Sequence, residues 1–306
     1  MLIALTSLGV GCLYFVPLWI LGLRAAPKLT PEDYKRCAFL SMLHTAGHVG
    51  AVVAMSAGAV SFTHIIKALE PMFSVFFGVL INGTADPLSV NMWLVPIVAG
   101  VVWAAVGTKI VNGDDILADI NMTAFGGAMV SNVAFSLRGL LSKRVKAESK
   151  SKNFSSSNLY SVLTLMSFCL FLPFALVIEG NRMTAAWPPV SGLTGDIPEK
   201  ILGIPVYANT PLNYLYFLVL ATGLFYYMYN EMAYLVLGEV SATAQAVANT
   251  VKRVVILLAT VAFLGETMDT NKAIGAAVAI TSTMVYSIAK TKAAASASSG
   301  GKKKKK

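Results

Sequence analysis

Apolar residues run along this chain in nine long stretches separated by short polar segments, which leaves little sequence for a water-soluble domain. The stretches cover residues 2–23, 36–58, 60–82, 88–108, 120–142, 159–180, 212–237, 240–264 and 270–289. A hydrocarbon core about 30 Å thick needs about 20 apolar residues per helix. Because backbone amides in lipid must bond within the protein, and continuous apolar runs do not suit a barrel, the pattern predicts an all-α, polytopic membrane helix bundle.

Composition supports this interpretation. Of the 306 residues, 56% are hydrophobic and 13% are charged, whereas soluble domains carry about 25% charged residues. The formal net charge of +9 does not indicate nucleic acid, since five of the 24 basic residues form the terminal run 302–306. We expect residues 293–306 to be a disordered Ser/Ala/Gly and Lys-rich tail, and the lipid bilayer to be the main partner.

The basic residues between the stretches are distributed unevenly. One set of alternate loops, including the C-terminal end, holds 16 Lys and Arg residues, whereas the other set holds four. By the positive-inside rule, this asymmetry places the C-terminus on the cytoplasm-equivalent side. No basic, serine-rich presequence precedes the first stretch, so we expect no targeting signal within this sequence.

A short internal repeat relates the two halves of the chain. Val60-Ser61-Phe62-Thr63 matches Val240-Ser241-Ala242-Thr243 at an offset of 180 residues, and each copy opens an apolar stretch. The stretch that each copy opens has one neighbouring stretch before it and one after it. Two further stretches precede this group of three in the second half, but only one precedes it in the first half. We therefore expect two inverted five-helix repeats, the first of which lacks its first helix: residues 1–108 with four spans, and residues 109–292 with five spans and a long loop at 181–211.

Four basic residues fall inside the apolar stretches, where each costs at least about 2.5 kcal/mol and calls for a reason. They are Lys67, Arg138, Lys252 and Arg253. The repeat places Lys67 and Lys252 in related spans, so we expect them on opposite walls of one cavity. Two ammonium groups and a guanidinium suit a phosphate dianion. The alternative is structural pairing with an acid such as Glu70 or Glu231.

Polar residues that suit hydroxyl groups accompany these cations. The candidates are His44, His48, His64, Tyr226, Tyr227, Tyr229 and Asn230, and interhelical packing is the alternative for each. We expect Glu70, before a helix kink at Pro71, to orient Lys67 or Arg138 rather than bind ligand. We also expect Gly126-Gly127 and Gly275 to be close helix contacts.

Signatures of catalysis are absent from the sequence. The chain has no H-E-x-x-H, G-x-S-x-G or phosphate-cradling P-loop motif. Cys12, Cys37 and Cys169 have no metal-ligand spacing. We therefore expect neither an enzyme nor a bound metal or cofactor.

The segment from Ser61 to Pro71, S-F-T-H-I-I-K-A-L-E-P, resembles the plastid phosphate translocator family of the drug/metabolite transporter superfamily. The resemblance extends to Gly47-His48-Val49, to Ser131-Asn132 followed by Arg138, and to Asn249-Thr250-Val251-Lys252-Arg253. It runs from about residue 7 to residue 292. The family has ten helices in two inverted halves, and residue 2 onward resembles its second helix.

The resemblance implies residue roles. Lys67, Lys252 and Arg253 would hold the phosphate, and His48, Tyr229 and Arg138 would surround the rest of the substrate. Glu70, Thr63, Asn230 and Asn249 would support them. Ala51 stands where the triose-phosphate branch tends to have a hydroxyl residue.

From the resemblance we expect a carrier that exchanges inorganic phosphate for a phosphorylated metabolite by alternating access, with triose phosphate or 3-phosphoglycerate as the first choice. The expected location is the plastid inner envelope or another plastid-bounding membrane. Hexose phosphate, phosphoenolpyruvate and a nucleotide-sugar carrier of the same superfamily are alternatives, as is a non-transporting receptor or scaffold. The oligomeric state stays open.

Overall fold

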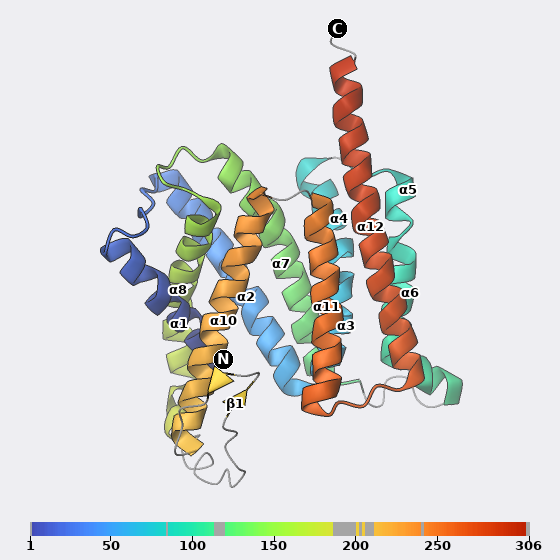
Figure 1. Cartoon of the computed structure of the whole chain (residues 1–306), viewed down its shortest axis with the longest axis horizontal. Coiled ribbons are helices and arrows are strands. Elements are labelled where there is room, and N and C mark those ends of the chain that lie inside the picture. Colours follow the sequence, from blue (N-terminus) through green and yellow to red (C-terminus); the bar gives the residue numbers. More distant parts are fainter. Residues whose placement is uncertain are drawn as a thin grey trace. The chain divides into compact units, whose positions relative to one another are not determined.

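The computed structural model describes residues 2–83, 85–112, 120–185, 200–201, 204–205, 211–239 and 242–303, and almost all of them are helical (Figure 1). The elements in chain order are α1 (Leu2–Ile20), α2 (Pro31–Ala57), α3 (Val60–Ile66), the 3₁₀ turn η1 (Lys67–Leu69), α4 (Glu70–Asn82), α5 (Leu88–Asn91), α6 (Leu94–Asn112), α7 (Met122–Glu148), α8 (Ser156–Ala185), β1 (Lys200–Ile201), β2 (Ile204–Pro205), α10 (Pro211–Glu239), α11 (Ala242–Leu264) and α12 (Thr270–Lys303). β1 and β2 pair antiparallel over two residues each.

The helices confirm the predicted membrane bundle. In the described part of the chain, seven helical segments are long and apolar enough to cross a bilayer: Leu2–Ile20, Pro31–Ala57, Val60–Ile81, Leu88–Asn112, Met122–Glu148, Ser156–Gly180 and Thr270–Ser296. α10 and α11 cover the other two expected spans and are 29 and 23 residues long. Each of the nine apolar stretches is thus mostly helix.

Several helices extend beyond their apolar runs. α2 begins at Pro31 because the Thr30 hydroxyl accepts a hydrogen bond from the Asp33 amide, at 3.2 Å, and proline suits the first turn. α12 continues to Lys303, beyond the expected end of the last span, and the expectation of a disordered tail from residue 293 stays a prediction. Residues 293–298 are mostly alanine, a strong helix former, which favours this continuation.

The chain forms two compact units, which do not coincide with the expected repeats. Unit 1 comprises residues 1–45 and 143–238, and unit 2 comprises residues 46–142 and 239–306. The boundary between repeats at residue 108 stays a prediction. Each unit is described by itself below.

In unit 1, glycines let α1 approach its neighbours closely. A Cβ on Gly11 would lie 2.7 Å from the Tyr227 ring of α10, and one on Gly9 would lie 3.0 Å from the Phe168 ring of α8. The close approach buries Phe15 and Tyr227, whose rings stack at a centroid distance of 5.3 Å. Small residues thus allow the aromatic core of this unit to form.

Unit 2 contains the analogous contact between α6 and α12, which lie side by side (Figure 1). A Cβ on Gly100 would lie 2.6 Å from the Ala279 amide, and Gly275 packs against the backbone of Ala104. Both helices therefore present small residues four apart, the spacing typical of close membrane helix contacts. The expected close contacts are confirmed for Gly275 and also for Gly127, which lies against Gly50 of α2. For Gly126 the expectation is wrong, because no atom of the described residues lies within 4 Å of a Cβ placed on it.

Candidate functional site

The third expected span is broken at the position of its lysine. α3 ends at Ile66, the 3₁₀ turn η1 covers Lys67–Leu69, and α4 begins at Glu70 with Pro71 in its first turn. The amide of Glu70 bonds the Lys67 carbonyl, three residues back, rather than the Ile66 carbonyl. The predicted kink is therefore a short change of helix type, a feature that often marks functional positions in helices.

Side chains of α7 bond backbone carbonyls on both sides of this break. The Asn132 Nδ2 donates to the Ile66 carbonyl at 2.9 Å, and the Ser136 hydroxyl donates to the Glu70 carbonyl at 3.1 Å. Asn132 and Ser136 are one helical turn apart and buried. Because an unsatisfied carbonyl in lipid is costly, these two side chains stabilise the broken helix.

A second face of α7 contacts the cations. The Lys67 Nζ donates to the Ser131 hydroxyl at 2.6 Å and lies 4.8 Å from the centroid of the Phe135 ring. The Arg138 guanidinium carbon lies 4.6 Å from the same ring centroid. Both distances allow cation–π attraction, so the Phe135 ring offsets part of the repulsion between the two positive groups.

The remaining two cations come from α11. Arg253 Nη2 lies 3.3 Å from Glu70 Oε2, and its side chain is 11% exposed. Lys252 precedes it on the same helix. The charges of Arg253, Lys252 and Arg138 all act on Lys67. The structure therefore gathers the four intramembrane cations of the sequence in unit 2.

A carboxylate lies beside the cations of this cluster. Among the described side chains in the spans of unit 2, Glu70 is the carboxylate that pairs with a cation of the cluster. It pairs with Arg253 and its charge also acts on Lys67, and the expectation that it orients Lys67 or Arg138 stays a prediction. The Phe135 ring of α7 contacts both Lys67 of the 3₁₀ turn and Arg138 of α7 itself. Four cations gathered in the spans beside this carboxylate favour an anionic ligand.

The other predicted residues have different surroundings. His48 is 5% exposed on α2, and Thr63 is fully buried on α3, both in unit 2. Tyr229, which is 45% exposed, and Asn230, whose Nδ2 donates to the Tyr226 carbonyl at 2.9 Å, lie on α10 in unit 1. The side chain of Asn249 lies outside the described residues. The proposed roles of these residues stay predictions.

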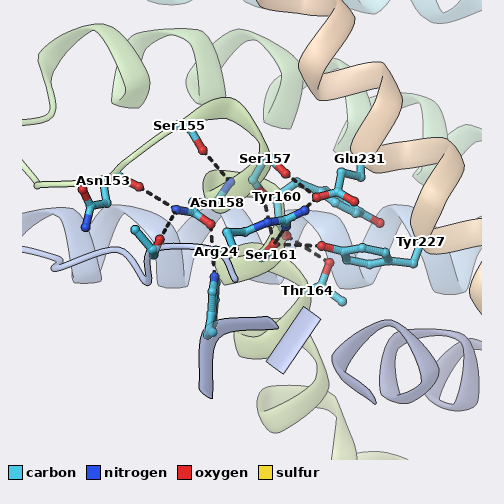
Figure 2. A network of polar contacts seen from close by, with 12 residues as sticks. Arg24, Asn153, Ser155, Ser157, Asn158, Tyr160, Ser161, Thr164, Tyr227 and Glu231 are labelled. Atoms are coloured by element: carbon cyan, nitrogen blue, oxygen red, sulfur yellow. Dashed lines mark hydrogen bonds and ion pairs between the residues drawn. The ribbon is translucent and has the colours of Figure 1, made fainter. Parts of the chain in front are cut away.

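Unit 1 contains a buried polar network that the sequence did not single out as a group (Figure 2). Arg24 Nη1 lies 2.6 Å from Glu231 Oε1 of α10, and the Ser157 hydroxyl of α8 donates to the same oxygen. The hydroxyls of Ser161 and Tyr227 share a hydrogen bond of 2.8 Å. Glu231 was considered as a partner for the intramembrane cations, but its partner is Arg24, which lies just outside an expected span.

A signal for this network exists in the sequence. Ser157 and Ser161 are four residues apart on α8, and Tyr227 and Glu231 are four apart on α10. Each pair therefore lies on one helix face. Only the packing of α8 against α10 shows that the two faces meet.

Another carboxylate stabilises a helix start in unit 2. Glu266, between α11 and α12, accepts hydrogen bonds from the amides of Val60 at 2.7 Å and Ser61 at 3.1 Å. These are the first amides of α3, where a negative charge is favourable. Burial acts to raise the pKa of Glu266, but the hydrogen bonds from Ser61 and Val60 outweigh it and hold this pKa below its usual range.

Comparison with known proteins adds a family to this geometry. Residues 1–287 match the Triose-phosphate Transporter family. The chain is 35% identical over 285 residues to glucose-6-phosphate/phosphate translocator 2, chloroplastic, of Arabidopsis thaliana. The aligned residues cover 93% of this chain and 66% of that protein. It is 34% identical over 291 residues to the xylulose 5-phosphate/phosphate translocator, chloroplastic, of the same organism, covering 95% and 63% of the two chains.

A third relative carries the expected triose-phosphate activity in its name. The triose phosphate/phosphate translocator, chloroplastic, of Spinacia oleracea is 31% identical over 293 residues, which cover 95% of this chain and 65% of that protein. The chain thus spans somewhat less than two thirds of the length of these relatives.

Proposed function

Because the chain belongs to the Triose-phosphate Transporter family, we propose that it is a secondary carrier that exchanges inorganic phosphate for a phosphorylated metabolite. The observation that carries the proposal is the gathering of four cations in the spans of unit 2. Arg138, Lys252 and Arg253 all act on Lys67, and Glu70 pairs with Arg253. A phosphate dianion suits such a group of cations.

Each cation has a part that suits its chemistry. The Arg253 guanidinium binds two phosphate oxygens as a planar fork once it leaves Glu70. Lys67 and Lys252 act as compact charges, with Ser131 holding the Lys67 ammonium in place. Arg138, beside Phe135, is one turn further along α7 and is assigned to the rest of the substrate together with His48 and Tyr229.

The break at Lys67–Leu69 supports a moving element at the binding position. Membrane carriers place discontinuous helices at their substrate sites, and a short 3₁₀ turn lets the two halves of a span reorient. Asn132 bonds the Ile66 carbonyl just before the 3₁₀ turn, and Ser136 bonds the Glu70 carbonyl just after it. We assign the alternation between the two faces of the membrane to motion about this turn.

Obligate exchange follows from the same electrostatics. Without an anion, the clustered cations repel one another and resist enclosure in a medium of low dielectric constant. A bound phosphate group neutralises them and allows the site to reorient. The empty carrier is then slow, and transport needs a phosphorylated compound on both sides.

The substrate branch has two candidates. Triose phosphate and 3-phosphoglycerate are the first choice from the residue pattern. Sugar phosphates with longer carbon chains are the second, because the relatives named for glucose 6-phosphate and xylulose 5-phosphate are 35% and 34% identical, against 31% for the triose phosphate relative. Ala51 also removes a hydroxyl that the triose-phosphate branch tends to have.

The proposed location is a plastid envelope membrane, and the names of these relatives include the word chloroplastic. The apolar helices supply the multi-pass character. The proposal includes no enzymatic activity and no cofactor.

The test is uptake of labelled phosphate into liposomes that contain the protein and are preloaded with one compound at a time. The preloads are phosphate, triose phosphate, 3-phosphoglycerate, phosphoenolpyruvate, glucose 6-phosphate, a nucleoside monophosphate, or nothing. Exchange predicts uptake only with a phosphorylated compound inside, and the best preload identifies the branch. Uptake into empty liposomes at the same rate would refute obligate exchange, and preference for the nucleoside monophosphate would indicate a nucleotide-sugar carrier.

A further inference from the structure

Two loops of unit 1 form a rigid clasp at one end of its helices. The loop after α1 and the loop before α8 meet in an antiparallel bridge in which Lys28 faces Lys152, and the Lys28 amide donates to the Lys152 carbonyl at 3.0 Å. The Thr30 amide donates to the Ser151 hydroxyl at 3.0 Å. We call residues 25–30 and 149–153 the loop clasp.

Further bonds fasten the loop clasp to the helices behind it. The Asn158 Nδ2 of α8 donates to the carbonyls of Ala25 at 2.8 Å and Asn153 at 2.7 Å, and its Oδ1 accepts from the Trp19 indole at 3.1 Å (Figure 2). Buried Asp33 accepts bonds from three hydroxyls, those of Thr30, Ser149 and Ser151. These hydrogen bonds therefore hold the backbones of the two loops in place.

The described carboxylates of unit 1 are all engaged by other groups. Asp33 binds the three hydroxyls, Glu32 pairs with Arg36, Glu148 pairs with Arg36 and Arg144, Glu179 accepts from the Leu2 amide, and Glu231 pairs with Arg24. Among the exposed lysines that these ion pairs do not include are Lys28, Lys35, Lys150 and Lys152. This end of the unit therefore carries positive charge that the described part of the protein does not balance.

The bridge adds to this imbalance. Like charges directly opposite each other in an antiparallel pair are destabilising. Here Lys28 and Lys152 occupy such positions, and the hydrogen bonds of the loop clasp keep the two loops together against that repulsion. An anion bound between the two ammonium groups would remove it.

The surface beside the loop clasp is apolar. Ile20, Leu21 and Leu23 are 77%, 70% and 73% exposed, at the end of α1 and just before the loop clasp. A free phosphate ion has no apolar part that could contact this surface. The headgroup of an anionic lipid would contact the lysines, and its acyl chains would contact the apolar side chains.

We propose that the loop clasp binds the phosphate of an anionic membrane lipid, between Lys28 and Lys152, with the lipid chains along Ile20, Leu21 and Leu23. Lys35 and Lys150 strengthen the local positive potential. The charge count of the sequence places these loops on the cytoplasm-equivalent side of the membrane, so the lipid belongs to that leaflet. The proposal is independent of what the carrier transports.

Trp19 provides a local probe, because its indole bonds Asn158 beneath the loop clasp. In a variant with Trp93, Trp103 and Trp187 changed to Phe, fluorescence of Trp19 is measured in bilayers containing brominated phosphatidylglycerol or brominated phosphatidylcholine. We expect phosphatidylglycerol to be preferred roughly fivefold to thirtyfold at low salt, the range for two lysines near a membrane surface. Sodium chloride at about 0.5 M weakens the preference.

The matched variants carry the same change of net charge. Lys28→Gln/Lys152→Gln is expected to bring the two lipids to equal quenching. Lys109→Gln/Lys272→Gln, in the last turn of α6 and the first turn of α12, which are assigned to the opposite face, keeps the preference. Circular dichroism checks folding of each variant. If the three Trp substitutions prevent folding, the shift of the thermal midpoint of the wild-type protein by each lipid replaces fluorescence.

Three results overturn the proposal. The first is equal quenching by both lipids in the protein with both lysines, and the second is an unchanged preference in Lys28→Gln/Lys152→Gln. The third is loss of the preference when millimolar inorganic phosphate is added at constant ionic strength, which would identify a site for free phosphate rather than for a lipid headgroup.

Discussion

Both units carry charged groups in or beside apolar helices, but they satisfy these groups in different ways. In unit 1, Arg24 pairs with Glu231, and hydroxyls of Ser157, Ser161 and Tyr227 complete the network (Figure 2). In unit 2, the cations at Lys67, Arg138, Lys252 and Arg253 share one carboxylate, that of Glu70. A charge that is paired and hydrogen-bonded contributes to folding. A surplus of one sign in a span indicates a ligand of the opposite sign.

The balanced network predicts the largest effect on stability. Glu231→Gln removes the partner of the Arg24 guanidinium and leaves that charge partly buried. Breaking a buried ion pair costs about 3–5 kcal/mol, and because the Arg24 side chain is 24% exposed we expect about 2 kcal/mol. Unfolding in detergent by urea or heat measures the change.

The control for this prediction is Glu32→Gln, which breaks an exposed pair with Arg36 and should cost less than about 0.5 kcal/mol. Phosphate exchange per folded molecule should stay within about twofold in both variants. Equal stability of the two variants would show that the Arg24–Glu231 pair is no more important than a surface pair.

The unbalanced cluster predicts a loss of function with little loss of stability. Lys252→Gln removes one charge from a group that repels itself, while removing a charged contact to phosphate costs about 1.5–3 kcal/mol. We expect the exchange rate at subsaturating phosphate to fall roughly tenfold to a hundredfold. Labelled phosphate exchange in liposomes measures it, with Lys272→Gln, in the first turn of α12 and outside the cluster, as the control.

An opposite pattern would support a scaffold or receptor. If Lys252→Gln destabilised the protein as strongly as Glu231→Gln, and the exchange per folded molecule were unchanged, the cations would serve folding alone. The proposed function would then lose its main support.

A smaller effect is expected from the carboxylate inside the cluster. Glu70→Gln frees Arg253 from the partner that phosphate must displace, and so we expect phosphate to bind several times more tightly, by roughly threefold to tenfold. Equilibrium binding of labelled phosphate to purified protein measures this, with Glu148→Gln as a control in unit 1. Weaker binding in Glu70→Gln would show that the carboxylate positions Arg253 rather than competing for it.

The smallest effect concerns the pH dependence of stability through Glu266. Its pKa is lowered in the folded state, so its contribution is complete above the ordinary value of 4.5 and disappears as the pH falls through the folded-state pKa. A carboxylate at a helix N-terminus contributes about 0.3–1 kcal/mol. The thermal midpoint of the wild-type protein should therefore fall more steeply below about pH 4.5 than that of Glu266→Gln. Parallel curves would show that the two amide bonds contribute nothing measurable.

Sequence patterns were sufficient for the class of fold. Apolar stretches of about 20 residues predicted helices that the structure has, because in lipid the backbone must bond locally. Lysines and arginines within those stretches were conspicuous for the same reason. The limits of helices were less predictable, as α12 shows, since they depend on propensity and capping beyond the apolar run.

Tertiary structure alone decided which charges meet. From the sequence, Glu70 was expected beside Lys67 or Arg138, and Glu231 was one acid among several. The packing of α11 on α3 and of α7 on the 3₁₀ turn brought Glu70 to Arg253 and Lys67 to Phe135. Helical periodicity assigns a residue to a face of its own helix, but the neighbour of that face depends on small residues and broken turns that set how closely helices approach.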